Sequence, residues 1–148
     1  MKGMSMDLSY LLTPLLAWLA AGTLKFAINS LRAGRPAFGL IGYGGMPSNH
    51  SAIVSSMAVL IALRHGISHP AFGVALTLAF IVILDAASLR RQVGRHAAAI
   101  NRLTRERQGE APLRERMGHT RWEILGGMAT GALVAYLVAT WLPCPQGC

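Results

Sequence analysis

Four stretches of the chain lack charged residues, and they set the pattern from which the fold can be predicted. These windows are residues 8–24, 36–63, 65–84 and 124–148. A helix that crosses a bilayer needs about 20 largely apolar residues, so each window is long enough or nearly so. The pattern predicts an all-α integral membrane bundle of four transmembrane helices, over residues 8–31, 48–65, 71–89 and 120–142.

The connector between the first two predicted helices is rich in glycine and proline. It runs from Gly34 to Pro47 and holds five glycines, a composition that argues against regular structure. At membrane depth such backbone must be buried in protein or line a water-filled cavity. Ser48 and Asn49 follow, and both residue types are common helix N-caps, which predicts that the second helix begins there.

Residues 89–121 differ from the rest of the chain because they are rich in charge. They include nine arginines and three glutamates. Within them Val93, Ala97 and Ile100 recur at helical spacing. This spacing predicts a cytoplasmic amphipathic helix in a basic insert at residues 90–118.

Composition narrows the class of protein. The 148 residues are enough for one domain, residues 1–148, and they are 53% apolar and only 14% charged. Soluble domains average about 45–50% apolar and about 25% charged residues, so a soluble enzyme and a nucleic-acid-binding module are excluded in spite of the net charge of +8. Cys144 and Cys148 are too few for a disulfide framework, and no His or Cys pair follows to complete a tetrahedral metal site.

Charge in the connectors predicts the orientation. Arg32 and Arg35 lie in the first connector, and the nine arginines already counted lie in the third. Four spans place these two connectors on the same face, which the positive-inside rule assigns to the cytoplasm. We therefore expect a multi-pass protein of the inner (plasma) membrane with a functional surface on its cytoplasmic face.

Most of the reactive side chains lie at the helix ends on this face. They are Lys25, Ser48, Asn49, His50, Asp85, Arg90, Arg91, His119 and Glu123. Ionisable groups near a bilayer are costly, which makes such a cluster a hypothesis about function.

His119 and Glu123 lie four residues apart, so both side chains share one face of a helix. The carboxylate can accept the proton of one imidazole nitrogen and leave the other as a nucleophile or a base. The alternative is a polar helix start at which the helix dipole stabilises the acidic residue. A zinc site would need a third ligand, and none lies at the usual spacing.

The segment from Gly44 to Ser51 predicts an anion site. Backbone N–H groups of a glycine-rich turn that includes Gly45, feeding a helix N-terminus, bind phosphate well. Ser48 and Asn49 add polar side chains, and His50 can supply a proton. The alternative is a plain loop with a helix cap.

Four cationic residues are candidates to neutralise phosphate oxygens: Lys25, Arg35, Arg90 and Arg91. The alternative is that they anchor the helix ends to anionic lipid headgroups. Asp85 lies near a helix C-terminus, where a carboxylate opposes the dipole. It should therefore have a cationic partner, for which Arg90 and Arg91 are both candidates.

Three segments together resemble the lipid phosphate phosphatase (type 2 phosphatidic acid phosphatase) and vanadium haloperoxidase superfamily, in its small divergent bacterial and plant branch. Residues 44–52, GGMPSNHSA, are similar to the Pro-Ser-x-His phosphate loop. Residues 85–101, DAASLRRQVGRHAAAIN, are similar to the Asp-Ala-x-Gly-Val-Arg-Arg segment of the branch. Residues 113–127, LRERMGHTRWEILGG, are similar to its Gly-His-x-Pro-x-Glu block.

The resemblance implies a metal-independent phosphohydrolase with no cofactor and a lipid phosphate as substrate. It implies that His119 attacks phosphorus, that Glu123 orients it and that His50 protonates the leaving oxygen. Ser48, Lys25 and one or more arginines would hold the phosphate. Phosphoryl transfer depends mainly on positioning and charge neutralisation, which such residues can supply.

The sequence departs from the pattern of the superfamily in several places. Nine residues separate Lys25 from Arg35 where the main family has six, and Leu113 stands where it has Arg. Glu123 replaces the usual Asp. Within the branch, three further positions differ from the usual Gly, Ser and Pro, namely Ser88, Asn49 and Arg121. Four spans are also fewer than the usual six, so a homodimer would be one way to complete the site.

Two other classes of function fit the composition. One is a non-catalytic membrane protein that binds anionic headgroups, or scaffolds a partner, through the arginine-rich segment. The other is a small transporter subunit that uses Asp85 and Glu123 as proton sites.

Overall fold

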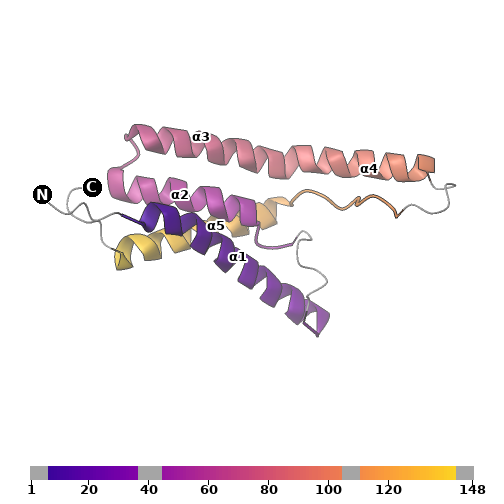
Figure 1. The fold of residues 1–148 in the computed structure, drawn as a ribbon, viewed down its shortest axis with the longest axis horizontal. Helices are drawn as coiled ribbons and strands as arrows, with labels where there is room; N and C mark the ends of the chain where they lie inside the picture. Colours follow the sequence, from indigo (N-terminus) through magenta and orange to yellow (C-terminus); the bar gives the residue numbers. More distant parts are fainter. Residues whose placement is uncertain (1–6, 37–44, 105–110, 143–148) are drawn as a thin grey trace, which may run out of the picture.

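A computed structural model describes residues 7–36, 45–104 and 111–142. Within these ranges the regular elements are all helical, which confirms the predicted all-α class. They are α1 (Ser9–Ala33), α2 (Asn49–His65), α3 (Pro70–Leu84), the π-helical turn η2 (Asp85–Leu89), α4 (Arg90–Thr104) and α5 (Arg121–Trp141), shown in Figure 1. Cys144 and Cys148 lie outside the described residues.

The basic insert does not begin as a separate helix. α3, η2 and α4 form one continuous helix of 35 residues, Pro70–Thr104 (Figure 1). The prediction of a separate amphipathic helix after residue 89 was therefore wrong. Ala86, Ala87 and Leu89 favour helix, and the π turn adds a local widening without breaking the chain direction.

The continuous helix is longer than a membrane is thick. At 1.5 Å per residue its 35 residues extend about 50 Å, whereas the hydrocarbon core is about 30 Å thick. Gly94 and Ala97 are the buried residues of α4, while Val93 and Ile100 are exposed. Of the three apolar side chains that predicted an amphipathic helix, Val93 and Ile100 thus lie on its open surface and Ala97 is buried.

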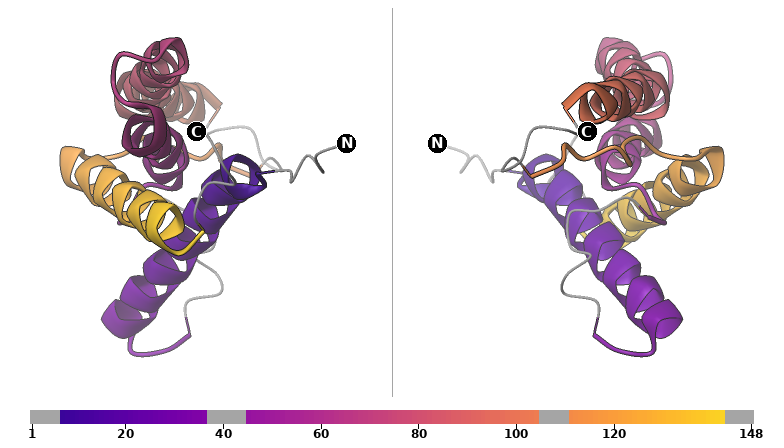
Figure 2. Two further views of the ribbon diagram at one scale, coloured as in Figure 1. Left: turned by 90° about the vertical axis from the view of Figure 1, so that its left-hand side faces the viewer. Right: turned by 90° about the vertical axis from the view of Figure 1, so that its right-hand side faces the viewer.

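Three helices in the described part of the chain are long and apolar enough to cross a membrane, which indicates a multi-pass membrane protein. They are α1, the α3–α4 helix and α5. α2, predicted as a further span, has 17 residues and is not among them. It lies between α3 on one side and the pair α1 and α5 on the other (Figure 2). Because protein surrounds it, α2 buries polar residues such as Ser51 and Ser56.

Glycines on α5 allow it to approach α2 closely. A Cβ atom built on Gly127 would lie 2.3 Å from the carbonyl oxygen of Ser48, and one on Gly131 would lie 2.3 Å from that of Ala52. Small residues of this kind are typical of close helix contacts in membranes. This contact sets the start of α2 directly beside the start of α5.

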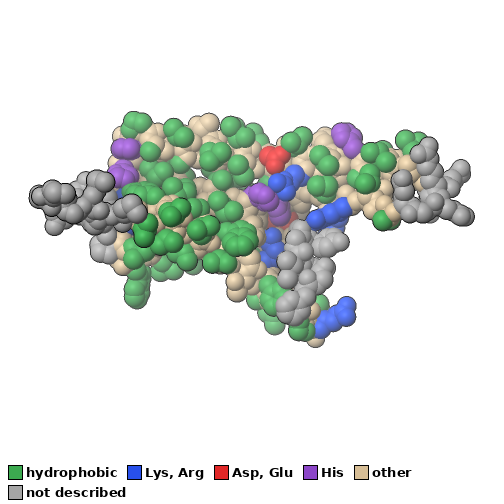
Figure 3. Space-filling view, viewed as in Figure 1, with side chains coloured by type: hydrophobic (Ala, Val, Ile, Leu, Met, Phe, Trp, Pro, Cys, Tyr) green, Lys and Arg blue, Asp and Glu red, His purple; other side chains and the backbone are tan. Residues whose placement is uncertain are grey.

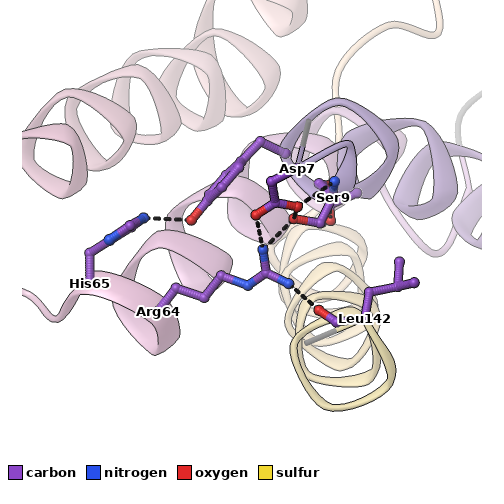
Figure 4. A network of polar contacts seen from close by, with 7 residues as sticks. Asp7, Ser9, Arg64, His65 and Leu142 are labelled. Atoms are coloured by element: carbon purple, nitrogen blue, oxygen red, sulfur yellow. Dashed lines mark hydrogen bonds and ion pairs between the residues drawn. The ribbon is translucent and has the colours of Figure 1, made fainter. Parts of the chain in front are cut away.

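A polar network joins the helix ends farthest from that contact (Figure 4). The Arg64 guanidinium at the end of α2 pairs with the Asp7 carboxylate at 2.6 Å and donates to the Leu142 carbonyl oxygen at the end of α5. It also donates to the Ser9 hydroxyl at the start of α1. The Arg64 side chain is only 6% exposed. One buried cation therefore holds three helix ends together.

Candidate active site

The reactive side chains gather where α2 begins, where η2 meets α4 and where α5 begins. Figure 3 shows histidine, basic and acidic side chains together in this region, between wide apolar surfaces. The ring centroids of His50 and His119 lie 6.2 Å apart, with the ring planes tilted by 55°. Segments that are far apart in the sequence thus bring the two predicted catalytic histidines close together in one site.

Glu123 fixes the orientation of His119. The His119 Nδ1–H donates to Glu123 Oε2 at 3.2 Å, and the same oxygen accepts the Thr120 backbone N–H at 2.8 Å. The Thr120 hydroxyl in turn accepts from the Glu123 backbone N–H, which completes a capping box at the start of α5. Because the carboxylate binds the proton on Nδ1, the lone pair of His119 is on Nε2.

His119 is buried, and its surroundings favour the neutral ring. Burial lowers the pKa of the His119 imidazole below its usual value of 6.5, and the charges of Lys25 and Arg90 act in the same direction. The Glu123 carboxylate opposes them and raises the pKa, but the net direction is downward. A neutral imidazole with a free Nε2 can act as a nucleophile.

The segment that leads to His119 is held against the α3–α4 helix. The His119 backbone N–H donates to the Ala86 carbonyl oxygen of η2 at 3.0 Å. Further along, the Asn101 side chain donates to the Leu113 carbonyl oxygen and accepts from the Leu113 N–H, both at 2.8 Å. A Cβ atom on Gly94 would lie 2.3 Å from the Glu115 carbonyl oxygen, so glycine is needed where the segment crosses α4.

Arg90 links His50 to Asp85. Its Nε–H donates to Asp85 Oδ2 at 3.1 Å, and its Nη2 lies 3.1 Å from His50 Nε2. The predicted cationic partner of Asp85 is thus Arg90. Arg91 points elsewhere, and its Nη2 donates to the His119 carbonyl oxygen at 3.4 Å.

Ser48 and Asn49 lie at the start of α2, as predicted. The Ser48 hydroxyl is fully buried, where it accepts from the Ser51 backbone N–H and hydroxyl. The Asn49 amide lies against α1, with its Nδ2 3.7 Å from the position of a Cβ on Gly22. Its Oδ1 is buried and has no hydrogen-bond partner among the described residues.

Lys25 extends the site onto α1. It lies within electrostatic reach of His50, His119 and Glu123. Gly45 packs against the same helix face, since a Cβ built on it would lie 3.9 Å from Lys25 Cγ and 3.5 Å from the Asn29 side chain. Asn29 was not predicted as a site residue, although it lies one helical turn from Lys25.

Arg35 is the predicted site residue that the structure leaves apart. It lies beyond the end of α1 and is exposed. The carboxyl-terminal half of α1 diverges from the other helices (Figure 1), and no described hydrogen bond or ion pair joins Arg35 to the site. Within residues 7–36, 45–104 and 111–142, no group of three or more His, Cys, Asp or Glu side chains is placed to hold a metal ion.

The sequence is similar to proteins of one known family. A model described as the divergent PAP2 family matches residues 6–134, a range that includes the site. The uncharacterized membrane protein YuiD of Bacillus subtilis (strain 168) is 31% identical over 146 residues, which cover 87% of this chain and 92% of that protein. No solved structure matches the chain significantly. The match over most of its length shows that this chain belongs to the divergent PAP2 family.

Proposed function

We propose that the protein is a membrane phosphatase that hydrolyses a lipid phosphomonoester or diphosphate through a phosphohistidine. The observation that carries the proposal is the arrangement of His119. Its Nδ1 is bound to Glu123 and its Nε2 is left available, and the centroid of its ring lies 6.2 Å from that of His50. Membership of the divergent PAP2 family supports the same chemistry.

In the first step, the His119 Nε2 lone pair attacks phosphorus. An N–P bond forms as the bond between phosphorus and the leaving oxygen breaks, and that oxygen takes a proton from the His50 imidazolium. The leaving group is a lipid alcohol from a monoester or a lipid monophosphate from a diphosphate. Glu123 stabilises the positive charge that develops on the His119 ring.

In the second step, water attacks the phosphohistidine. His50, now neutral, takes a proton from this water as the N–P bond breaks, and the bond electrons return to His119 Nε2. Inorganic phosphate leaves, and both histidines are restored for a new cycle. The same residue thus serves as acid and then as base.

The cationic residues neutralise the phosphate oxygens. Lys25 approaches from α1 and Arg90 from the start of α4, while Arg91 lies beside the His119 backbone. The backbone at Gly45 and the first residues of α2, Asn49 and His50, add N–H groups at a helix N-terminus. Preorganised positive charge of this kind stabilises the charge spread over the equatorial oxygens in the transition state.

The apolar and basic segments also suggest how the protein lies in the membrane. α1, α2, α3 and α5 form four spans, and the basic α4 continues from α3 beyond the cytoplasmic surface of the inner membrane. Arg32 at the end of α1 and the arginines of α4 support this orientation. The name of the Bacillus subtilis relative, a membrane protein, agrees with a membrane location. A homodimer would supply further helices to complete the site.

Phosphate release from a panel of lipid phosphates tests the proposal. The protein is purified in detergent and assayed with EDTA present, beside a His119→Ala variant. We expect release by the wild type and none by the variant, with the substrates ranked in the same assay. If well-folded wild-type protein binds anionic bilayers but releases no phosphate, the chain is a headgroup-binding protein instead.

A further inference from the structure

The contact between Arg90 and His50 fixes which ring nitrogen of His50 carries a proton. A guanidinium group only donates hydrogen bonds, so the His50 Nε2 that lies 3.1 Å from Arg90 Nη2 must hold a lone pair. The ring in this arrangement is therefore neutral, with its proton on Nδ1. That Nδ1 is buried and has no hydrogen-bond partner in the described part of the chain.

While Arg90 holds its Nε2, His50 cannot perform either of its proposed steps. A neutral imidazole is not an acid near neutral pH, and the lone pair that would accept a proton from water is already bound to Arg90. A proton on Nε2 would place a second positive charge 3.1 Å from the guanidinium. The Lys25 ammonium also lies near enough to oppose a positive charge on His50, whereas the Asp85 carboxylate favours one.

Arg90 is placed to leave His50 when an anion enters the site. Its side chain is 37% exposed, so the guanidinium can turn without displacing a packed core. The Asp85 carboxylate accepts the Arg90 Nε–H, so the two terminal nitrogens of the guanidinium can exchange one hydrogen-bond partner for another. A phosphate group attracts a guanidinium more strongly than a neutral imidazole does, because bidentate pairing with an anion is charge-assisted.

We propose that Arg90 is a substrate-controlled gate on His50. In the empty site Arg90 occupies His50 Nε2 and keeps the ring neutral. A bound phosphate group draws the guanidinium away, and the freed Nε2 takes a proton from solvent beside the new negative charge. This inference rests on the proposed function, and it makes the acid available only after the phosphate is in place.

Ring nitrogen NMR of histidine tests the gate directly. Protein labelled with ¹⁵N-histidine in nanodiscs is measured at pH 7, free and saturated with a lipid phosphonate whose C–P bond resists hydrolysis, and His50→Gln assigns the His50 signals. We expect Nε2 of His50 in the unprotonated range in the free protein and in the protonated range with phosphonate. Inorganic phosphate at saturation should produce the same change, which would show that the phosphate group suffices.

Two variants separate the gate from a merely structural contact. In Arg90→Met nothing holds the Nε2 lone pair, so we expect the free protein to lose the fixed Nδ1–H form and show a mixture of ring states. If Arg90→Met does not fold, Asp85→Asn tests the same point, because it loosens Arg90 and should shift the free protein partway toward that mixture. Arg91→Met is the matched control and should leave the His50 signals of the free protein unchanged.

The outcomes for the gate and for the phosphatase are distinguishable. A protonated Nε2 in the free wild type, or no change on saturation with phosphonate, overturns the gate, even if the protein releases phosphate normally. A clear change in His50 on binding supports the gate. If that change occurs in a protein that hydrolyses no lipid phosphate, the gate stands as part of a binding site and the proposed hydrolysis fails.

Discussion

The backbone N–H of Ser48 donates to the carbonyl oxygen of Glu123 at 2.8 Å. This single bond joins the first turn of α2, which carries His50, to the first turn of α5, which follows His119. The distance between the two histidines is therefore set by the backbone contact of these helices as well as by their side chains.

Gly127→Ala should disturb the site through this contact. Its new Cβ would lie 2.3 Å from the Ser48 carbonyl oxygen and 2.9 Å from Ser51 Cβ, so α2 and α5 must move apart. We expect the free energy of unfolding to fall by about 1–3 kcal/mol and kcat to fall with it. Thermal unfolding and phosphate release measure the two effects.

Gly73→Ala is the matched control for this prediction. Gly73 is also helical, but a Cβ there meets nothing within 4 Å. Its Tm and kcat should equal or slightly exceed those of the wild type. Equal losses in both variants would show that the α2–α5 contact does not position the site.

Glu123→Gln should remove the orientation and charge that Glu123 gives to His119. The amide of glutamine can present its NH2 group, a donor, to the Nδ1–H of His119. It also carries no negative charge to stabilise the imidazolium. We expect kcat to fall by about 10²–10⁴-fold, by analogy with the loss of a buried carboxylate from a histidine pair. Glu123→Asp should retain more activity than Glu123→Gln, and the reverse order in steady-state assays would contradict this role.

The lowered pKa of His119 predicts the pH dependence of the nucleophile. Because the folded pKa lies below the usual 6.5, the ring should remain neutral in weakly acidic solution and protonate only at lower pH. The unfolded chain then binds more protons than the folded one between the two pKa values, so this residue makes stability rise with pH across that window. NMR titration of His119 in the free protein measures the pKa directly, and a midpoint above 6.5 would contradict the account.

Arg64→Ala should affect stability without affecting chemistry. It removes the buried cation that pairs with Asp7 and binds the Leu142 carbonyl oxygen, at the helix ends away from the site. We expect the free energy of unfolding to fall by about 2–4 kcal/mol. Below the reduced Tm, kcat/KM should match that of the wild type. A large loss of kcat/KM in folded protein would mean that the network communicates with the site.

Sequence reasoning predicted the parts of the fold and site that depend on local spacing. Apolar windows located α1, α2 and α5 to within a few residues. The four-residue interval between His119 and Glu123 predicted a contact that the structure contains. The apolar windows depend on helix periodicity, which can be read from nearby residues. The expectation that His119 and Glu123 share one helix face was wrong, because His119 precedes the N-cap Thr120 and reaches Glu123 from outside α5.

The parts that sequence reasoning missed depend on how helices pack in space. The change from apolar to basic residues after Leu89 suggested a boundary, but charge alone does not stop a helix. Arg35 was expected in the site, although the end of α1 diverges from it, and Asn29 was not expected, although the face of α1 that holds Lys25 brings it against Gly45. Nothing local in the sequence shows which way α1 leaves the bundle.

Trapping the covalent intermediate tests the central claim most directly. Wild-type protein is mixed with ³²P-labelled lipid phosphate and quenched with alkaline detergent within one turnover, since a phosphohistidine survives alkali. We predict label on the protein at His119, located by mass spectrometry of its peptide, and no label on His119→Ala. Steady turnover with no labelled His119, or label that persists in His119→Ala, would contradict the account.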